Sequence, residues 1–148
     1  MANALYGLGR QAFLKGLIDW TETTGSDIKI ALIDRTDYTV SINVDQYMNY
    51  DTVPDAASIP GGISGNLASL TSTLGVADAA NIVLTAVAAG DAADDVIVFM
   101  DGGDAGATQS GTNDLLIAYY DTFASGMPVT PNGGDITVAW HSSGLFAL

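Results

Sequence analysis

The last third of the chain, residues 113–148, constrains the fold most. An apolar run at 115–120 is followed by Pro and Gly residues between 126 and 134, and the apolar pattern resumes at 136–140. Apolar runs of this length that are bounded by turn residues are typical of strands. We expect the two runs to be adjacent antiparallel strands, and we expect the segment 140–148 to end in a short strand that closes a sheet. The sequence therefore predicts a β-rich domain.

The size and composition of the chain fit a single domain. A chain of 148 residues can bury roughly 70% of the surface that its unfolded form exposes, so a core can form without covalent links. There is no cysteine, which excludes disulfides, a thiolate nucleophile and Cys-based metal sites. We predict a mainly β, single-domain antiparallel sandwich or barrel-like fold, with a short N-terminal helix and one short helical turn near 45–55. The expected division is an N-terminal helix or arm at 1–20 and one β-rich domain at 21–148.

The charge distribution excludes one class of partner. The chain has 17 acidic residues against 4 Lys plus Arg, a net charge of −13, and all four bases lie within the first 35 residues. Residues 1–36 are neutral in sum, so the acidic excess lies in the rest of the chain. Such a surface repels phosphate, because nucleic-acid affinity depends on Lys and Arg. We therefore expect no nucleic-acid partner.

The sequence gives no sign of a membrane segment. Its apolar runs are all far shorter than the roughly 18–20 residues of a membrane-spanning helix. The N-terminus lacks the ordered regions of a signal peptide. We expect synthesis in a cytoplasm and no membrane partner.

The N-terminal segment predicts a short helix over 4–15. Asn3 is a suitable cap, and Gly16 is a natural stop. Gly7 and Gly9 each weaken such a helix by about 1 kcal/mol relative to Ala, so a partner surface is expected to hold it. The helix is either a docking arm or a helix packed on the protein's own sheet, and the second interpretation is favoured. The residues that a docking arm would present to a partner are Leu5, Tyr6, Leu8, Arg10 and Phe13.

The segment 45–57 predicts one or two helical turns, with Asp45 as the cap and Pro54 at the end. Two tyrosines, Tyr47 and Tyr50, lie there at nearly helical spacing. They form either a recognition patch that contacts a partner or a cover over one end of the β domain. The second interpretation is favoured, because aromatic side chains at this spacing usually pack.

The remaining segments are interpreted from their apolar pattern and their turn residues. The glycine-rich segments 58–65 and 102–111 are expected to be loops, the second of them mobile and on the surface. Strands are expected at 27–34, 66–74, 80–88 and 95–101. The last two of these, at 80–88 and 95–101, should be neighbours.

The sequence offers little catalytic chemistry. Its only histidine is His141, in the segment WHSSG. Adjacent side chains on a strand point to opposite faces, so a dyad with Ser142 or Ser143 would be strained, and an ordinary exposed or strand-edge histidine is favoured. The glycine motifs of dinucleotide and phosphate sites do not occur, and one His without Cys excludes zinc. We expect a protein that is not an enzyme and that has no cofactor.

Aspartates before and after the strand expected at 95–101 leave one alternative open. Loop carboxylates can hold calcium, but the segment DGGDAG lacks the spacing of an EF-hand loop. A solvated acidic face is favoured over a calcium site. The residues concerned are Asp91, Asp94, Asp95, Asp101, Asp104 and Asp114.

Several segments, in their order along the chain, show a resemblance to a known family. They are ALYGLGRQAFLKG with a tryptophan after it, IKIALID followed by DYTV, GVADAANIVLTAV followed by VIVFMD, and LIAYYDTFASGMPVTPNGGDITVAWHSSGLFAL. The stretch GMPVTPNGGDITVAW is the most specific. Over most of its length the chain resembles a family of small structural proteins of tailed-bacteriophage virions. The segment GGDAGATQSG and the strong acidity depart from the family pattern.

This resemblance implies a capsid decoration (cement) protein that binds the major capsid protein on the exterior of the virion and stabilises the shell. It also implies a homo-oligomer, such as a trimer, and it brings no catalytic residues. Residues 3–15, within the N-terminal segment that is neutral in sum and contains the bases, would then face the partner while the acidic loops face solvent. The alternative is a receptor- or carbohydrate-binding module of a head or tail fibre, with Tyr47, Tyr50 and the segment 102–111 as its contact surface. A virion hydrolase has the least support from the residues.

Overall fold

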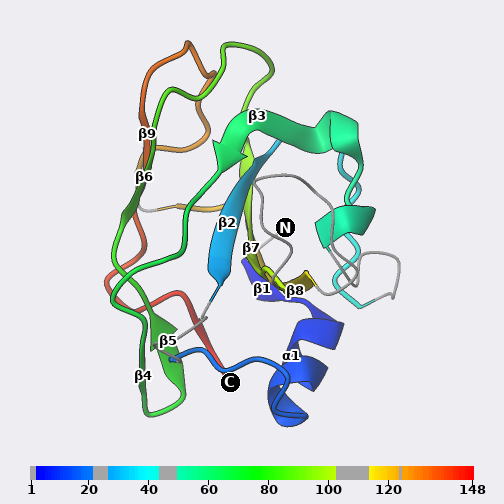
Figure 1. The fold of residues 1–148 in the computed structure, drawn as a ribbon, viewed down its shortest axis with the longest axis vertical. Helices are drawn as coiled ribbons and strands as arrows, with labels where there is room; N and C mark the ends of the chain where they lie inside the picture. The colour runs from blue at the N-terminus through cyan, green and yellow to red at the C-terminus, as the bar shows by residue number, and fades with distance from the viewer. Residues whose placement is uncertain (1–2, 22–26, 44–49, 103–113, 124) are drawn as a thin grey trace.

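The structure, a computed structural model, describes residues 3–21, 27–43, 50–102, 114–123 and 125–148. It confirms the predicted mainly β architecture with antiparallel sheets and a short N-terminal helix (Figure 1). None of the described helices is long and apolar enough to cross a membrane. The helical elements are α1 (Gly7–Leu14) and the 3-10 turns η2 (Tyr50–Thr52) and η3 (Asp55–Ala57). The strands are β1 (Ala4–Leu5), β2 (Ile28–Ile33), β3 (Ser58–Ile63), β4 (Thr71–Thr73), β5 (Val76–Asp78), β6 (Ile82–Leu84), β7 (Asp95–Met100), β8 (Leu115–Tyr120), β9 (Ile136–Val138) and β10 (Phe146–Ala147).

A five-stranded antiparallel sheet in the order β1-β8-β7-β2-β3 forms the centre of the fold. Apart from Lys29 and Asp95, which form ion pairs, its three middle strands are apolar and almost wholly buried, as expected for strands that lie between two layers. β2 and β7 pair in continuous register from Ile28↔Met100 to Ile33↔Asp95. The strands expected at 27–34 and 95–101 are therefore confirmed.

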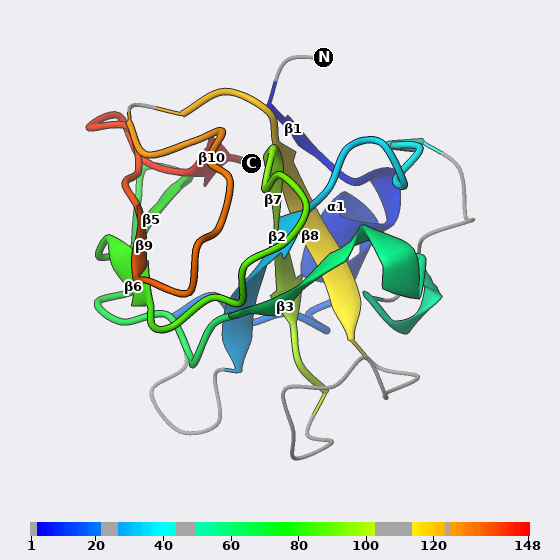
Figure 2. The same ribbon diagram turned by 90° about the horizontal axis from the view of Figure 1, so that it is seen from above.

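Two smaller sheets, β10-β5-β4 and β6-β9, lie on one side of the five-stranded sheet (Figures 1 and 2). Their inward side chains, such as Leu84 and Val138, join Ile30 and Val98 of the central sheet in the main core. The opposite face of the sheet is covered by the segment that contains η2 and η3, where a second apolar cluster forms. The result is a sandwich-like arrangement with a partly helical outer cover.

The strand pairing expected for the last third of the chain is wrong. β8 lies between β1 and β7, whereas β9 pairs with β6 in a different sheet. The runs at 80–88 and 95–101 were expected to form neighbouring strands. This expectation is also wrong, because β6 and β7 belong to different sheets. In β9 Ile136 and Val138 are buried and Thr137 is exposed, whereas β7 and β8 are buried on both faces. An alternating strand fits an outer layer, and a uniformly apolar strand fits the middle of a sheet. The short final strand is present as β10, paired with β5.

Two other expectations fail because of local backbone geometry. The segment 58–65, expected to be a loop, contains β3 instead. β3 is an edge strand, and Pro60 is tolerated at an edge because its missing N–H need not bond to a neighbour. The strand expected over 66–74 is reduced to β4, because Ser69 and Leu74 both have positive φ, at 55° and 52°.

The helical turn expected near 45–55 corresponds to η2 and η3. Pro54 lies directly before η3, so it begins a turn and does not end the segment. The expected cap Asp45, Tyr47 and residues 103–111 of the expected surface loop lie outside the described residues.

The N-terminal helix is shorter than expected, because the two residues that precede Tyr6 form β1. Asn3 does not cap it. The side-chain oxygen of Asn3 accepts hydrogen bonds from the backbone N–H groups of Asp121 and Thr122, at 3.1 and 3.0 Å, and so joins β1 to the end of β8. Gly16 follows the helix with a φ of 66°, as expected for a stop.

α1 packs on the protein's own sheet, as the favoured interpretation predicted. It lies against β8, where Gly9 is buried and faces the backbone of Leu116. Ala12 of the helix, and Ile18 and Trp20 of the segment that follows, belong to the main core. The N-terminal residues that the structure describes are therefore part of the packed fold.

Candidate partner-binding face

The residues predicted to contact a partner do not all lie on the surface. Tyr6 and Tyr50 are only 2% and 1% exposed. The ring of Tyr50 stacks on that of Phe99, with centroids 4.3 Å apart, so it serves the second apolar cluster. Tyr47 lies outside the described residues. The structure therefore does not place the predicted tyrosine patch on the surface.

The other predicted residues gather around α1. Leu5 is buried at the edge of the sheet, Leu8 and Phe13 are half-buried, and Arg10 is exposed. Leu8 lines a small hollow between the helix and β8. Leu5, Arg10 and Phe13 line a different groove, on the side of the helix that faces β10.

This groove, of about 370 Å³, runs between α1 and the end of the chain. Leu14 and Leu148 line it and are 90% and 64% exposed. Single exposed leucines are common, but several large apolar side chains beside one groove mark an interaction surface. We call this surface the α1–β10 face, and its residues are Leu5, Arg10, Phe13, Leu14, Ala147 and Leu148.

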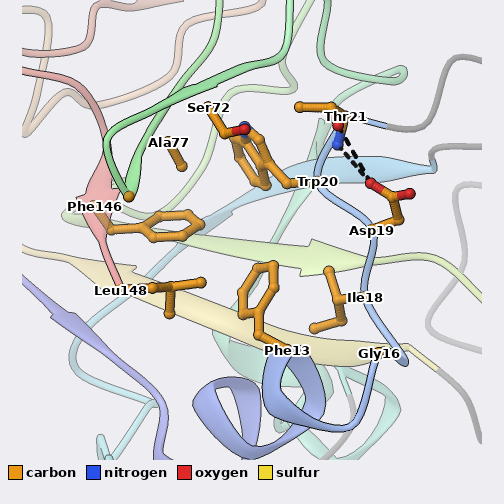
Figure 3. Close-up of a pocket in the computed structure, with 11 residues that line it drawn as sticks. Phe13, Gly16, Ile18, Asp19, Trp20, Thr21, Ser72, Ala77, Phe146 and Leu148 are labelled. Atoms are coloured by element: carbon orange, nitrogen blue, oxygen red, sulfur yellow. Dashed lines mark hydrogen bonds between the residues drawn. The ribbon is translucent and has the colours of Figure 1, made fainter.

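A second hollow, of about 350 Å³, adjoins the α1–β10 face and shares Phe13 and Leu148 with it (Figure 3). One wall is aromatic: the ring of Phe146 lies 5.0 Å from that of Trp20, edge to face, and 5.8 Å from that of Phe13. The Nε1–H of Trp20 donates to the carbonyl of Thr71 at 3.0 Å, which fixes the indole. The aromatic side chains therefore give this part of the surface a rigid floor.

The charges beside the α1–β10 face are mainly basic. Arg10 makes only a long contact of 3.4 Å with the Oδ1 of Asn43. Neither Arg10 nor Lys15 has an ion-pair partner among the described residues, whereas the other two bases of the chain each pair with an aspartate. The nearby Asp19 is turned back on its own chain and accepts the backbone N–H of Thr21 at 3.0 Å (Figure 3). In a chain of net charge −13, the α1–β10 face is therefore the part of the surface that suits an acidic group on a partner.

A buried polar cluster surrounds Asp95 at the start of β7. Asp95 is wholly buried and accepts hydrogen bonds from the guanidinium of Arg35 and the hydroxyl of Tyr119. The hydroxyls of Tyr6 and Tyr38 bond to each other. Burial raises the pKa of Tyr6 and Tyr119, and the hydrogen bond with Asp95 raises the pKa of Arg35. Every member has a partner inside the fold, so the cluster is a structural one.

The catalytic alternative, a dyad of His141 with Ser142 or Ser143, corresponds in the structure to a contact within a local turn. The Nδ1 of His141 lies 2.7 Å from the Oγ of Ser143 and accepts the Ser143 backbone N–H at 3.2 Å. The contact is exposed, and no carboxylate in the described part of the chain orients the ring. Nor do the described residues contain a group of three or more His, Cys, Asp or Glu that could hold a metal ion. Of the proposed calcium ligands, Asp101 pairs with Lys29, and Asp104 lies outside the described residues.

Comparison with known proteins gives no relative: no family model, curated protein or solved structure matches this chain. The α1–β10 face is thus interpreted from its own geometry. Leu14 and Leu148 were not among the residues predicted from the sequence to contact a partner. Leu14 follows Arg10 by four residues and so lies on the polar side of the helix, where an apolar residue was an available signal. The sequence contains no comparable signal for Leu148, because an apolar residue at the end of a strand also fits a core position.

Proposed function

We propose that this protein is a non-enzymatic structural protein of a tailed-phage virion, a decoration protein that binds the outside of the major capsid shell and stabilises it. The resemblance described above supports the phage assignment. The observation that supports binding is the exposure of Leu14 and Leu148, 90% and 64%, beside the groove of about 370 Å³. A shell protein that covers the α1–β10 face would remove both side chains from water.

Apolar burial supplies most of the affinity in this proposal. Covering a large apolar side chain completely contributes about 1.5–3 kcal/mol. An exposed ion pair contributes only about 0–1 kcal/mol. Arg10, the base that lines the groove, therefore orients the partner more than it holds it.

The distribution of charge supports a fixed orientation on the shell. α1 and the C-terminus lie at the lower end of the molecule in Figure 1, whereas β2 ends and β7 begins near the upper end. The exposed Asp37 and Asp91 lie in the segments that follow β2 and precede β7. With the α1–β10 face on the shell, these acidic segments point to solvent, where like charge discourages unwanted association.

We also propose a homo-oligomer, with a trimer as the expected form. Binding of several copies of the face at once raises the effective affinity without any new contact. Native mass spectrometry of the purified protein tests this, and a monomer at all concentrations would remove the avidity argument.

Quantitative mass spectrometry of purified virions tests the function. The expected result is a copy number comparable to that of the major capsid protein. Absence from the particle, or only a few copies, would overturn the proposal. A few copies, located at fibres by immunolabelling, would instead favour the fibre module, which has lost Tyr50 as a contact residue because that side chain is buried.

A variant pair tests the face. Leu14→Asp places a charge on the face, and Val83→Asp places the same charge on β6, where Val83 is 53% exposed outside the α1–β10 face. Both proteins should fold, as shown by equal thermal midpoints. Only Leu14→Asp should fail to bind undecorated capsids in a sedimentation assay; equal binding by both variants would contradict the assignment of the face.

A further inference from the structure

The edge of β1 has backbone groups that the fold leaves unpaired. Leu5 is opposite Ala118 of β8, and the N–H of the next residue, Tyr6, donates to the carbonyl of Ile117 at 3.0 Å. Along an antiparallel pair, residues that bond to the neighbouring strand alternate with residues whose N–H and C=O point away from it. Since Tyr6 is bonded to β8, Leu5 is one of the residues whose backbone groups point away from β8. Its N–H and C=O point out of the five-stranded sheet.

Burial makes these two groups unusual. Leu5 is only 9% exposed, yet neither its N–H nor its C=O has a hydrogen-bond partner among the described residues. Backbone groups of a largely buried residue are usually paired, so the groups of Leu5 bond either water in the groove that Leu5 lines or a partner that displaces this water. The edge of β1 therefore has the character of a strand whose neighbour is supplied from outside.

β10 provides a second open edge across a groove. The N–H of Leu148 donates to the carbonyl of Gly75 at 3.0 Å, and Ala147 is opposite Val76. The same alternation turns the N–H and C=O of Ala147 away from β5. β1 and β10 are edge strands of two different sheets, and a groove of about 200 Å³ between them is lined by both Leu5 and Ala147.

The groove has a lining of mixed polar and apolar character and a basic neighbour. Tyr120, Leu145 and Phe146 also line it. Leu5 and Ala147 line the α1–β10 face as well, so the groove continues into that face, where Arg10 has no ion-pair partner among the described residues. The occupant thus needs free backbone groups, apolar side chains and one negative charge.

We propose that this groove binds an extended peptide segment of a partner chain, which adds as a strand to the edge of β1. Its backbone pairs with the N–H and C=O of Leu5, its apolar side chains contact Phe13 and Leu148, and a carboxylate on it pairs with Arg10. Addition of a strand to a sheet edge is a recurrent mode of peptide recognition, in which the main chain gives affinity and alternate side chains give selectivity. A helix is unsuitable, because its backbone groups are already bonded to each other.

A second copy of this chain is the less suitable occupant. Each copy has a net charge of −13, so two copies repel each other unless salt screens them. That the partner is a shell protein rests on the proposed function, but the mode of binding rests on the backbone geometry alone.

Selection from a displayed library of random short peptides tests the binding mode. The full-length protein should enrich peptides that alternate apolar residues and contain Asp or Glu. With a synthetic copy of an enriched peptide, amide hydrogen exchange at Leu5, followed by NMR, should slow at least about 10-fold, because a new ladder bond protects that N–H. Methylating the peptide backbone nitrogen that bonds to Leu5 should weaken binding about 10-fold or more.

Variants of the protein test the charge. Arg10→Gln should weaken binding of an acidic peptide by about threefold to fivefold, the size of one exposed ion pair, and should leave its Asn-substituted form unaffected. Lys15→Gln is the matched control, since Lys15 does not line the groove. No enriched peptide, binding without protection of Leu5, or indifference to every backbone methylation would overturn the proposal. Protection of Leu5 that appears on concentrating the free protein, with a dimer in analytical ultracentrifugation, would assign the groove to a second copy.

The two proposals fail separately. High copy number in virions without peptide binding would leave the decoration function standing and remove the strand groove. Peptide binding with the stated protection, in a protein absent from virions, would leave the groove standing and remove the decoration function.

Discussion

Gly9 of α1 lies directly against the carbonyl of Leu116 in β8. A Cβ atom built on Gly9 would lie 2.6 Å from the Leu116 oxygen and 3.0 Å from the Ile117 oxygen. Both are backbone atoms of a central strand, so they cannot rotate away as the end of a side chain could. The helix and the sheet therefore meet through a position that only glycine fits.

Gly9→Ala should lower the free energy of unfolding by about 1–2 kcal/mol. Alanine favours a helix over glycine by about 1 kcal/mol, but the added methyl forces α1 off β8, and overpacking of this kind costs about 1–3 kcal/mol. Urea denaturation followed by circular dichroism measures the difference. Gly90→Ala is the control, because a Cβ there meets nothing within 4 Å, and it should change stability little. Equal stability of the wild type and Gly9→Ala would show that the helix can shift freely.

Arg35→Gln should destabilise the fold by about 3 kcal/mol, because it leaves a buried carboxylate without its counter-charge. Asp95 is wholly buried, and in the described part of the chain the Tyr119 hydroxyl is the side chain that would still donate to it in this variant. Lys15→Gln removes an exposed base that has no ion pair in the described structure, and it should change stability by less than about 0.5 kcal/mol. Chemical denaturation at neutral pH compares the two; a similar small effect for both would show that water reaches Asp95.

The three middle strands of the central sheet could be predicted, because their local sequence indicates that they are buried. Apart from Lys29 and Asp95, the segments that form β2, β7 and β8 are apolar throughout, and runs of this length bounded by turn residues favour strands covered on both faces. Gly16 likewise marks the end of α1, because its left-handed backbone is a local requirement.

The pairing of strands and the candidate face could not be predicted in the same way. β9 follows β8 in the chain but bonds to β6, a choice that depends on which layer each strand joins. Nearly helical spacing favoured a packed role for the tyrosines but could not indicate the packing partner of Tyr50, which is Phe99, 49 positions away. The α1–β10 face joins residues from the two ends of the chain, so no local pattern indicates it.

Tyr50→Ala should destabilise the protein by about 3–5 kcal/mol, because it removes a buried ring and leaves a cavity beside Phe99. Tyr50→Phe keeps the stacked ring and loses the contact of 3.0 Å between the Tyr50 and Ser58 hydroxyls. It should cost about 1 kcal/mol. Thermal unfolding measures both. A loss of infectivity in a phage with Tyr50→Ala would consequently report misfolding, so Tyr50→Phe is the informative variant for any receptor role.

The protein should lose stability steeply in alkali. Burial raises the pKa of Tyr6, Tyr119 and Tyr120, whereas tyrosines in the unfolded chain titrate near pH 10. Below that pH the three tyrosine hydroxyls are protonated in both the folded and the unfolded chain, so their contribution to the stability of the fold is fully present. Above it the unfolded chain releases protons that the folded chain retains, so the free energy of unfolding falls by up to about 1.4 kcal/mol per pH unit for each such tyrosine.

Urea denaturation between about pH 8 and pH 11 measures this slope, and absorbance at 295 nm reports tyrosinate, which should appear for these residues only as the protein unfolds. Tyr120→Phe is the matched variant. It loses the hydrogen bond from the Tyr120 hydroxyl to the carbonyl of Leu145, 2.9 Å long, and should be about 1 kcal/mol less stable near neutral pH. Its decline above pH 10 should nevertheless be shallower than that of the wild type, because one raised pKa has been removed. Equal slopes, or tyrosinate at all three positions in a protein that is still folded, would show that these hydroxyls are open to water.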